Sequence, residues 1–386
     1  MTQREVAERA GVSVDLISKL EQGTKQTTLL VTLHKIAGAL DVDVSALLAQ
    51  PERVDVAGED QDRDHDRGIL AIRRAVTAPD DSAEPASLAD LQQSASYAWS
   101  AHRGSHYDVL GGMLPAFIGA ARAAASRTPS PEVFAVLSDA YVVAAPMLVY
   151  LGYVDLGYLV MERALVAAER SNDPLRRAAA SGRMSWMLLH HTGSAEQAMR
   201  LAAGEAARVE PRLGAALPDE VAVWGGLLVD AAVAAARAGR AEEADDLLNL
   251  AEVAAVRVEA ATQPRAAEGF FGRPRFGLPL VVMQAVDGAV VTGRVGRALE
   301  VAKRMPPDMA LPMDWKARHL GDVAHAMTIS GNDAAATELL LSIERMSPDW
   351  MRYQAYPRVI VRELLERERR ARTPRLRALA ARLDVA

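Results

Sequence analysis

The sequence predicts an all-α protein, with a small helical domain at the N-terminus and a long array of stacked helical hairpins behind it. Half of the 386 residues are hydrophobic but only 5% are aromatic, which favours helices packed through small side chains over sheets. The first 23 residues contain two short amphipathic segments joined by a glycine turn. Further along, turn glycines followed by small residues recur.

The composition also indicates in which cellular compartment the protein is expected. The chain has no cysteine, which excludes disulfides and thiolate chemistry and is typical of a reducing cytoplasm. The start MTQREV lacks the apolar region of a secretion signal. The apolar stretch 277–293 is interrupted by Gln284 and Asp287 and is too short to span a bilayer. We therefore expect a cytoplasmic protein that does not enter membranes.

The charge distribution argues against a protein that coats nucleic acid without specificity. The net charge is −6, and residues 1–49 hold five basic and six acidic side chains. Residues 50–84 hold five basic and ten acidic ones, and the remainder balances at 34 against 34. A non-specific DNA binder needs a strong positive excess, which no segment has.

Local signals define two helices at the start of the chain. Thr2 and Glu5 have the spacing of a capping box, which begins a helix that Gly11 ends in a left-handed turn. Ser13 caps a second helix, predicted over 14–22 and ended by Gly23. The side chains expected to face inward are Val6, Ala7, Leu16, Ile17 and Leu20.

A further helix is predicted over 28–40, and Asp43 caps a last turn over 44–48. Two short helices joined by a tight glycine turn form a helix-turn-helix, whose second helix enters the major groove of DNA. The apolar face of the 28–40 helix comprises Leu29, Leu33, Ile36, Ala37 and Leu40.

The segments TQREVAERAGVSVDLISKLEQG and LHKIAGALDVDVSALL resemble the lambda-repressor-like, or XRE, family of helix-turn-helix domains. The alanine of the first helix, the glycine turn and the Ile-Ser-x-Leu-Glu-x-Gly ending fall in register over a domain of residues 1–49. The resemblance implies double-stranded DNA as a partner, with some positions facing bases and others the phosphate backbone. The corresponding residues are Gln3, Val14, Asp15, Ser18, Lys19, Gln22 and Lys25.

The chemistry of these residues supports DNA contact only in part. Lys19 can donate to guanine, Asp15 can accept from cytosine and Val14 can contact a thymine methyl group, but Asp15 also repels phosphates. Members of the family carry a further basic helix before this motif, whereas only Met1 precedes it here. Two explanations stay open: the natural start lies upstream, or the domain is vestigial.

Residues 50–86 are predicted to form an acidic linker, because they are rich in Asp, Pro and Gly and lack sustained periodicity apart from 69–76. Asp62, Asp64 and Asp66 have the spacing that opens a calcium loop. Gly68 is misplaced for such a loop, however, and no glutamate closes it. We expect a solvated tether.

Residues 87–386 are predicted to form an α-solenoid of helical hairpins, in which neighbours stack because one hairpin cannot bury its apolar face alone. Each turn glycine is followed five residues later by a small residue that lets the second helix pack closely. The pairs are Gly152 with Gly157, Gly193 with Ala198, Gly239 with Ala244, Gly293 with Ala298, and Gly331 with Ala336.

This pattern resembles tetratricopeptide repeats, although its spacings are longer and less regular. The order of XRE domain, acidic linker and alanine-rich tetratricopeptide-like array also resembles a class of actinobacterial regulators. That resemblance implies a transcription factor and names no ligand, cofactor or operator.

The first helix of each hairpin lines the concave face of a solenoid, where a peptide or small-molecule effector binds. For each candidate residue there, the alternative is a structural role as a core anchor or an ion pair between repeats. The candidates are Tyr141, Arg183, Trp186, Trp224, Asp230, Gln284, Asp287, Arg318, His319 and Asp322.

The histidines do not favour a metal site. His190 and His191 are adjacent on a helix, so their side chains diverge by about 100°. His319, Asp322 and His325 are spaced so that His325 drifts off the face that the other two share. We expect no metal and no cofactor, and the chain lacks the nucleophile–base constellation of an enzyme.

Two further segments have predicted roles next to the helical array. Residues 269–277, GFFGRPRFG, form either a lid over the groove or an ordinary connection, and the arginine-rich tail 362–383 is predicted to cap the array. The favoured hypothesis is a homodimeric DNA-binding regulator whose array dimerises and senses an effector. The alternative is a protein-interaction scaffold with a vestigial DNA-binding head.

Overall fold

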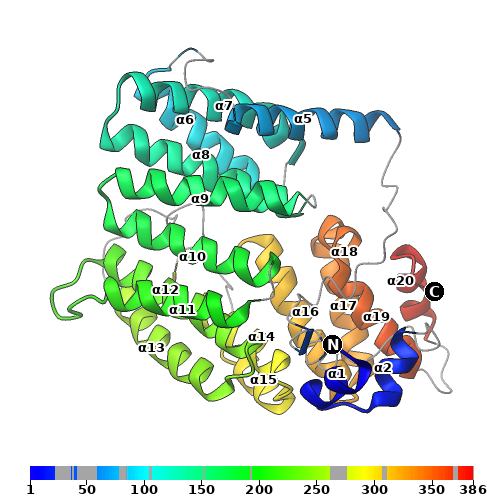
Figure 1. Cartoon of the computed structure of the whole chain (residues 1–386). Helices are drawn as coiled ribbons and strands as arrows, with labels where there is room; N and C mark the ends of the chain where they lie inside the picture. The colour runs from blue at the N-terminus through cyan, green and yellow to red at the C-terminus, as the bar shows by residue number, and fades with distance from the viewer. Residues whose placement is uncertain are drawn as a thin grey trace.

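The computed structural model describes most of the chain, and all the secondary structure in the described part is helical, which confirms the all-α class (Figure 1). The described residues are 1–21, 36, 39–40, 59–77, 84, 86–103, 107–150, 153–191, 194–260, 276–306, 311–367 and 373–385.

The first two helices form as their local signals predict. Helix α1 spans Gln3–Ala10 and α2 spans Val14–Glu21. The Thr2 hydroxyl accepts from the Glu5 amide at 3.3 Å and the Glu5 carboxylate accepts from the Thr2 amide at 2.7 Å, which completes the capping box. Gly11 ends α1 in the left-handed region, with φ 62°.

A small apolar cluster holds these helices to the segment that follows. Ile17 is its buried residue from α2, whereas Leu16 and Leu20 are only half-buried. Leu40 was expected in this core but is 36% exposed, and its neighbour Ala39 is buried instead. Ile36, also predicted on this face, is buried as expected, and Leu29, Leu33 and Ala37 lie outside the described part of the chain. The cluster comprises Val6, Ala7, Ala10, Ile17, Ile36 and Ala39.

The expectation of a solvated tether over 50–86 is wrong for residues 59–77. They form α5 (Glu59–Thr77), which packs against α7 (Tyr107–Arg127). Ile69, Ile72 and Val76 are all buried in the main core, because a stripe at helical spacing outweighs the acidic composition of the flanking residues. The three aspartates with calcium-loop spacing lie within this helix rather than in a loop.

The remaining helices form consecutive hairpins that stack on one another, as Figure 1 shows. The pairs are α6 (Leu88–Arg103) with α7, α8 (Pro131–Tyr150) with α9 (Val154–Arg170), α10 (Pro174–His191) with α11 (Ala195–Arg208), α12 (Pro218–Arg237) with α13 (Ala241–Glu259), α14 (Leu278–Val291) with α15 (Val295–Ala302), and α16 (Met313–Ile329) with α17 (Asp333–Met346).

Helices α18 (Pro348–Tyr353), α19 (Ala355–Arg367) and α20 (Pro374–Arg382) follow the last hairpin. Leu376 and Leu379 of α20 are buried in a core shared with α17 and α19. Arg382 donates to Glu344 of α17 at 2.6 and 2.7 Å. The tail thus covers the last hairpin, as the prediction of a capping role requires.

The turn glycines have the geometry that the repeat pattern predicts. Gly239, Gly293 and Gly331 adopt φ values of 77°, 74° and 80°, a left-handed conformation that other residues rarely adopt. Gly152 and Gly193 lie outside the described residues. Each small residue five positions after a turn glycine is buried: Gly157, Ala198, Ala244, Ala298 and Ala336.

At Gly157 the two helices of a hairpin approach each other closely. A Cβ added there would lie 3.1 Å from the carbonyl oxygen of Ala145 in α8. Any larger residue would push α9 away from α8, so the small side chain sets the distance between the two helices.

Two helical segments in the described part of the chain, residues 109–127 and 131–149, are long enough and apolar enough to span a bilayer. Within the fold, 78% of the second window and 39% of the first are buried. Helix α8 is packed against α6, α7, α9 and α10, so its apolar composition is satisfied inside the protein.

Enlarging the small residue of a hairpin is expected to destabilise the array. Ala336→Leu introduces three carbon atoms at a position with 0% exposure and should lower the free energy of unfolding by about 1–3 kcal/mol. Chemical denaturation of the full chain measures this. Ala334→Leu, at an exposed position of the same helix, is the control, and equal effects of the two substitutions would contradict the packing argument.

Candidate functional site

The second helix of the N-terminal pair presents the face that the resemblance assigns to DNA. The Ser13 hydroxyl accepts from the Leu16 amide at 3.2 Å and fixes the start of α2. From that start, Val14 (44% exposed), Asp15 and Lys19 project into solvent, and Ser18 is half-buried beside them. The side chains lie on one side of α2, so the geometry allows them to enter a groove together.

Three of the predicted DNA contacts, Gln3, Asp15 and Lys19, have partners within the protein. Lys19 Nζ lies 2.7 Å from Asp15 Oδ2, in an exposed pair one helical turn apart. Gln3 Nε2 donates to Glu21 at 2.5 Å and so joins the start of α1 to the end of α2. Gln22 and Lys25 lie outside the described residues. Of the predicted set, the structure therefore places Val14, Asp15, Ser18 and Lys19 together.

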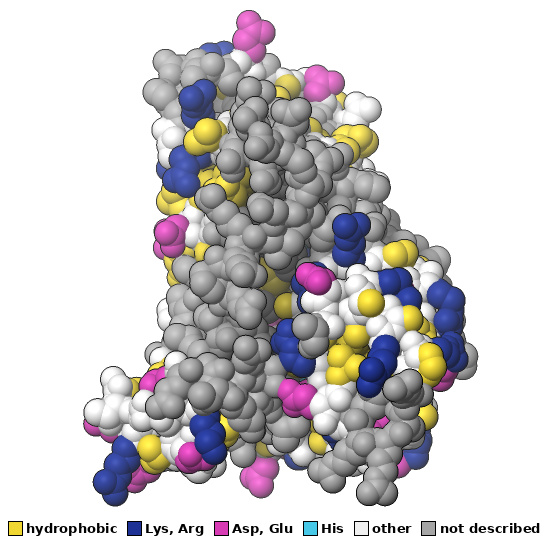
Figure 2. All heavy atoms as spheres, turned by 90° about the vertical axis from the view of Figure 1, so that its right-hand side faces the viewer, with side chains coloured by type: hydrophobic (Ala, Val, Ile, Leu, Met, Phe, Trp, Pro, Cys, Tyr) yellow, Lys and Arg dark blue, Asp and Glu magenta, His cyan; other side chains and the backbone are white. Residues whose placement is uncertain are grey.

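Elsewhere, basic side chains form no broad surface on the face that Figure 2 shows. In the described part of this face, which bears α5, α20 and the C-terminus in Figure 1, Lys and Arg are interspersed with acidic and hydrophobic side chains. This side of the array therefore offers no broad basic surface to the phosphate backbone of DNA.

Several candidates for an effector groove are structural instead. Tyr141 and Trp224 are 3% and 6% exposed and belong to the hydrophobic cores, and Trp186 packs against the first of these cores. These aromatic side chains anchor hairpins, which was the alternative considered for them. Arg183, Asp230 and Gln284 are half-buried on the first helices of their hairpins.

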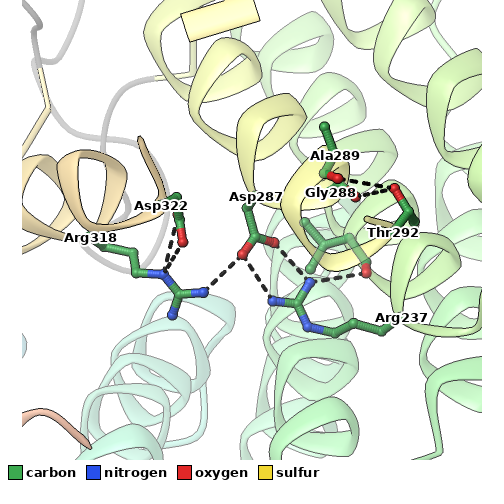
Figure 3. Close-up of polar contacts among 8 residues, drawn as sticks. Arg237, Asp287, Gly288, Ala289, Thr292, Arg318 and Asp322 are labelled. Carbon is green, nitrogen blue, oxygen red and sulfur yellow. Dashed lines mark hydrogen bonds and ion pairs between the residues drawn. The ribbon is translucent and has the colours of Figure 1, made fainter. Parts of the chain in front are cut away.

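Three of the remaining candidates, Asp287, Arg318 and Asp322, belong to a charged network that crosses successive hairpins (Figure 3). Asp287 of α14 accepts from both terminal nitrogens of Arg237 of α12, at 2.9 and 3.3 Å. The same carboxylate accepts from Arg318 of α16 at 2.8 Å. One buried carboxylate thus joins the first helices of three hairpins.

The network continues along α16. Arg318 Nε donates to both oxygens of Asp322, at 3.1 and 3.3 Å, and its guanidinium lies 4.6 Å from the ring centre of Tyr356 in α19. Burial raises the pKa of Asp322 to about 6, and the positive charge of Arg318 opposes this shift. Two arginines therefore face two aspartates, and the network is close to neutral.

A second chain of polar contacts extends from Tyr356. Its hydroxyl lies 3.3 Å from His325 Nδ1, and His325 Nε2 lies 3.2 Å from Glu363 Oε2. His325 is fully buried. The sequence does not single out Arg237, Tyr356 and Glu363, because their partners lie on other elements and no local spacing signals such pairs.

His319 stands apart from these contacts. It is 2% exposed, and burial lowers its pKa to about 4. Among the described residues its Nδ1 has no hydrogen-bond partner. No group of three His, Asp or Glu side chains in the described part of the chain could hold a metal ion. The side chains of His190 and His191 lie outside the description.

The buried histidine gives a pH-dependent term in stability. Because the pKa of His319 is lowered from 6.5 to about 4, the stability of the neutral form is present above pH 6.5 and is lost as the pH falls toward 4. The His319→Gln variant should lack this term. Between pH 6.5 and 4, the free energy of unfolding of the variant should therefore fall by about 1–3 kcal/mol less than that of the wild type. Denaturant titrations at each pH measure the difference.

The Asp322→Asn variant should change the pH dependence of stability in the opposite direction to His319→Gln. The pKa of Asp322 is raised from 3.8 to about 6, so its carboxyl stabilises the fold at low pH and loses that effect as the pH rises through 6. The Asn variant should therefore lose stability toward acid more steeply than the wild type.

Parallel pH profiles for His319→Gln and the wild type would contradict the assignment of a buried neutral histidine.

The comparison with protein families bears on the N-terminal segment. Residues 1–47 match the family model described as helix-turn-helix, and the match includes α1, the Gly11 turn and the exposed face of α2. No curated protein matches the chain. The N-terminal segment is therefore a helix-turn-helix domain of the XRE type, which places the chain among DNA-binding transcription regulators.

Proposed function

We propose that this regulator reads a specific DNA operator through α2, and that its array of hairpins joins two copies and senses an effector. The observation that carries the proposal is the helix-turn-helix match over residues 1–47, together with a capped α2 whose outer face is free of the core. We further propose that the protein works in the cytoplasm and is not an enzyme.

The electrostatics of α2 favour specificity over strong non-specific binding. The Asp15–Lys19 pair is exposed, with side chains 70% and 53% accessible, so the pair itself contributes little to stability, about 0.3–0.5 kcal/mol. DNA can therefore compete for Lys19 at small cost. While the pair is intact, it reduces the attraction of Lys19 for any phosphate.

Two copies are expected to act together. Helix-turn-helix dimers contact two half-sites about one DNA turn apart, and linking two weak heads raises the effective concentration of the second. An effector bound to the array would act by favouring one spacing of the heads, and only through its different affinities for the two states. The tetratricopeptide-like character of the array supports this proposal by analogy alone.

The first test is DNA binding by a lysine variant. A duplex selected from a random library with the full chain should bind about tenfold or more weakly to Lys19→Ala, because a base or phosphate contact is lost. Fluorescence anisotropy at several salt concentrations measures this. Lys303→Ala is the matched control, since Lys303 lies in a similar exposed pair with Glu300 at 2.6 Å.

The outcomes separate the proposal from its rival. If the selected duplex shows no salt-sensitive binding, or if the two lysine variants weaken it equally, α2 is not the reading helix. The array would then remain as a protein-interaction scaffold with a vestigial head.

A second prediction concerns the acidic residue of the pair. Asp15→Asn should release Lys19 and remove a negative charge that faces the phosphates, so binding to unrelated duplexes should rise severalfold. The ratio of specific to non-specific affinity should fall, because Asn cannot replace a carboxylate that accepts from cytosine in the same way. The same anisotropy assay with selected and scrambled duplexes checks both effects, and unchanged affinity for the scrambled duplex would contradict them.

A further inference from the structure

Helix α13 carries hydrophobic side chains on the face that points away from the array. Leu250, Val253 and Val256 are 48%, 53% and 58% exposed. In the described part of the chain, no other helix has more than one large hydrophobic side chain this exposed. Figure 1 shows α13 at the margin of the array. Outer faces of packed helices are ordinarily polar, so this stripe needs an explanation.

The opposite side of α13 already has its partners. Its inner residues are buried against α12 and α14, so the stripe is not needed to hold the hairpin together. The inner residues are Ala244, Leu248, Ala251, Ala254, Ala255 and Val258.

The spacing of the stripe fits a second copy of the same helix. Leu250 and Val256 lie three residues before and three residues after Val253. If two α13 helices cross antiparallel with a two-fold axis at Val253, Val253 meets its own counterpart and each Leu250 meets the other copy's Val256. The stripe is thus complementary to itself, as a two-fold interface requires.

Charge supports the same arrangement. Asp246 and Arg257 are both exposed, near opposite ends of α13. In the antiparallel pair, Arg257 lies opposite Asn249 of the other copy, and Asp246 is one helical turn beyond. The Nε of Arg257 donates to the Leu213 carbonyl of its own chain at 3.2 Å, which leaves its terminal nitrogens to face Asp246. The two-fold axis repeats the contact. A parallel pair would instead place the acidic N-terminal turns, which hold Glu242 and Glu243, side by side.

We propose that α13 is the homodimer interface of this protein, with the occupant of its apolar face being α13 of a second copy. This inference deepens the proposed function, because it names the surface that would join two DNA-binding heads. The surface that one pair of helices buries is small compared with the ~800 Å² that each partner buries in a standard protein–protein interface. We therefore expect a dimer that dissociates on dilution.

The absence of cysteine from the chain permits a direct test of the register. In the full chain, Val253→Cys should form a disulfide-linked dimer under mild oxidation at least tenfold faster than Val166→Cys, an equally exposed control (60%) on α9. Non-reducing gels measure the rate. Leu250→Cys and Val256→Cys should each cross-link poorly alone but efficiently when mixed, because a residue offset by three from the axis is about 9 Å from its own counterpart along the helix.

A second measurement does not depend on disulfide formation. Sedimentation velocity of the full chain should show a concentration-dependent dimer that Val253→Arg abolishes and Val166→Arg leaves unchanged, with circular dichroism confirming that both variants are folded. Equal cross-linking at positions 253 and 166, or a dimer that survives Val253→Arg, would overturn the α13 interface. Binding of the selected duplex that still depends on Lys19 would, in that case, leave the proposed DNA-binding function standing.

Discussion

The array depends on the close approach of the two helices in each hairpin, which is set just after the turn. At Gly239, Gly293 and Gly331 a left-handed glycine reverses the chain, and the small residue five positions later is buried. Where that residue is glycine, at position 157, the neighbouring backbone oxygen would lie 3.1 Å from an added Cβ, and the alanines at the other turns are fully buried. With the helices this close, large side chains such as Leu340 and Trp224 fill the space further from the turn. Each hairpin then offers its neighbour a regular apolar surface.

Stacking of the hairpins adds a second constraint, because charged side chains are buried between them. Asp287 is shared by Arg237 and Arg318 from the hairpins on either side, and Arg176 of α10 donates to Asp139 of α8, in the preceding hairpin, at 2.9 Å. Desolvation makes a buried charge costly unless it is paired, so each pair penalises any shift of one hairpin against the next. Such pairs fix the register of the stack more than they add to its net stability. An effector that altered the spacing of the heads would have to act through this register.

The parts of the fold that could be predicted from sequence are those governed by neighbours along the chain. The Thr2–Glu5 capping box, the Gly11 turn and the small residues after the turn glycines all depend on contacts within a few residues. Helix α5 was missed because its acidic flanks outweighed three apolar residues, whose value appears only when α7 covers them. In the candidate site, too, only the features that depend on neighbours along the chain could be predicted. The exposed face of α2 follows from helical geometry, whereas the roles of Tyr141 in a core and of Asp287 between two arginines depend on other hairpins.

The charge of the chain gives a physical reason to link the proposed dimer to DNA binding. Most of the net charge of −6 lies in residues 50–84, while residues 85–386 balance, and α2 offers one lysine that is itself paired with an aspartate. A single head therefore gains little from counterion release. Two heads held by one interface bind with far greater strength than either alone, since the second contact forms within the complex. Weak association through a short apolar stripe is sufficient for this, because the duplex itself stabilises the dimer when both half-sites are occupied.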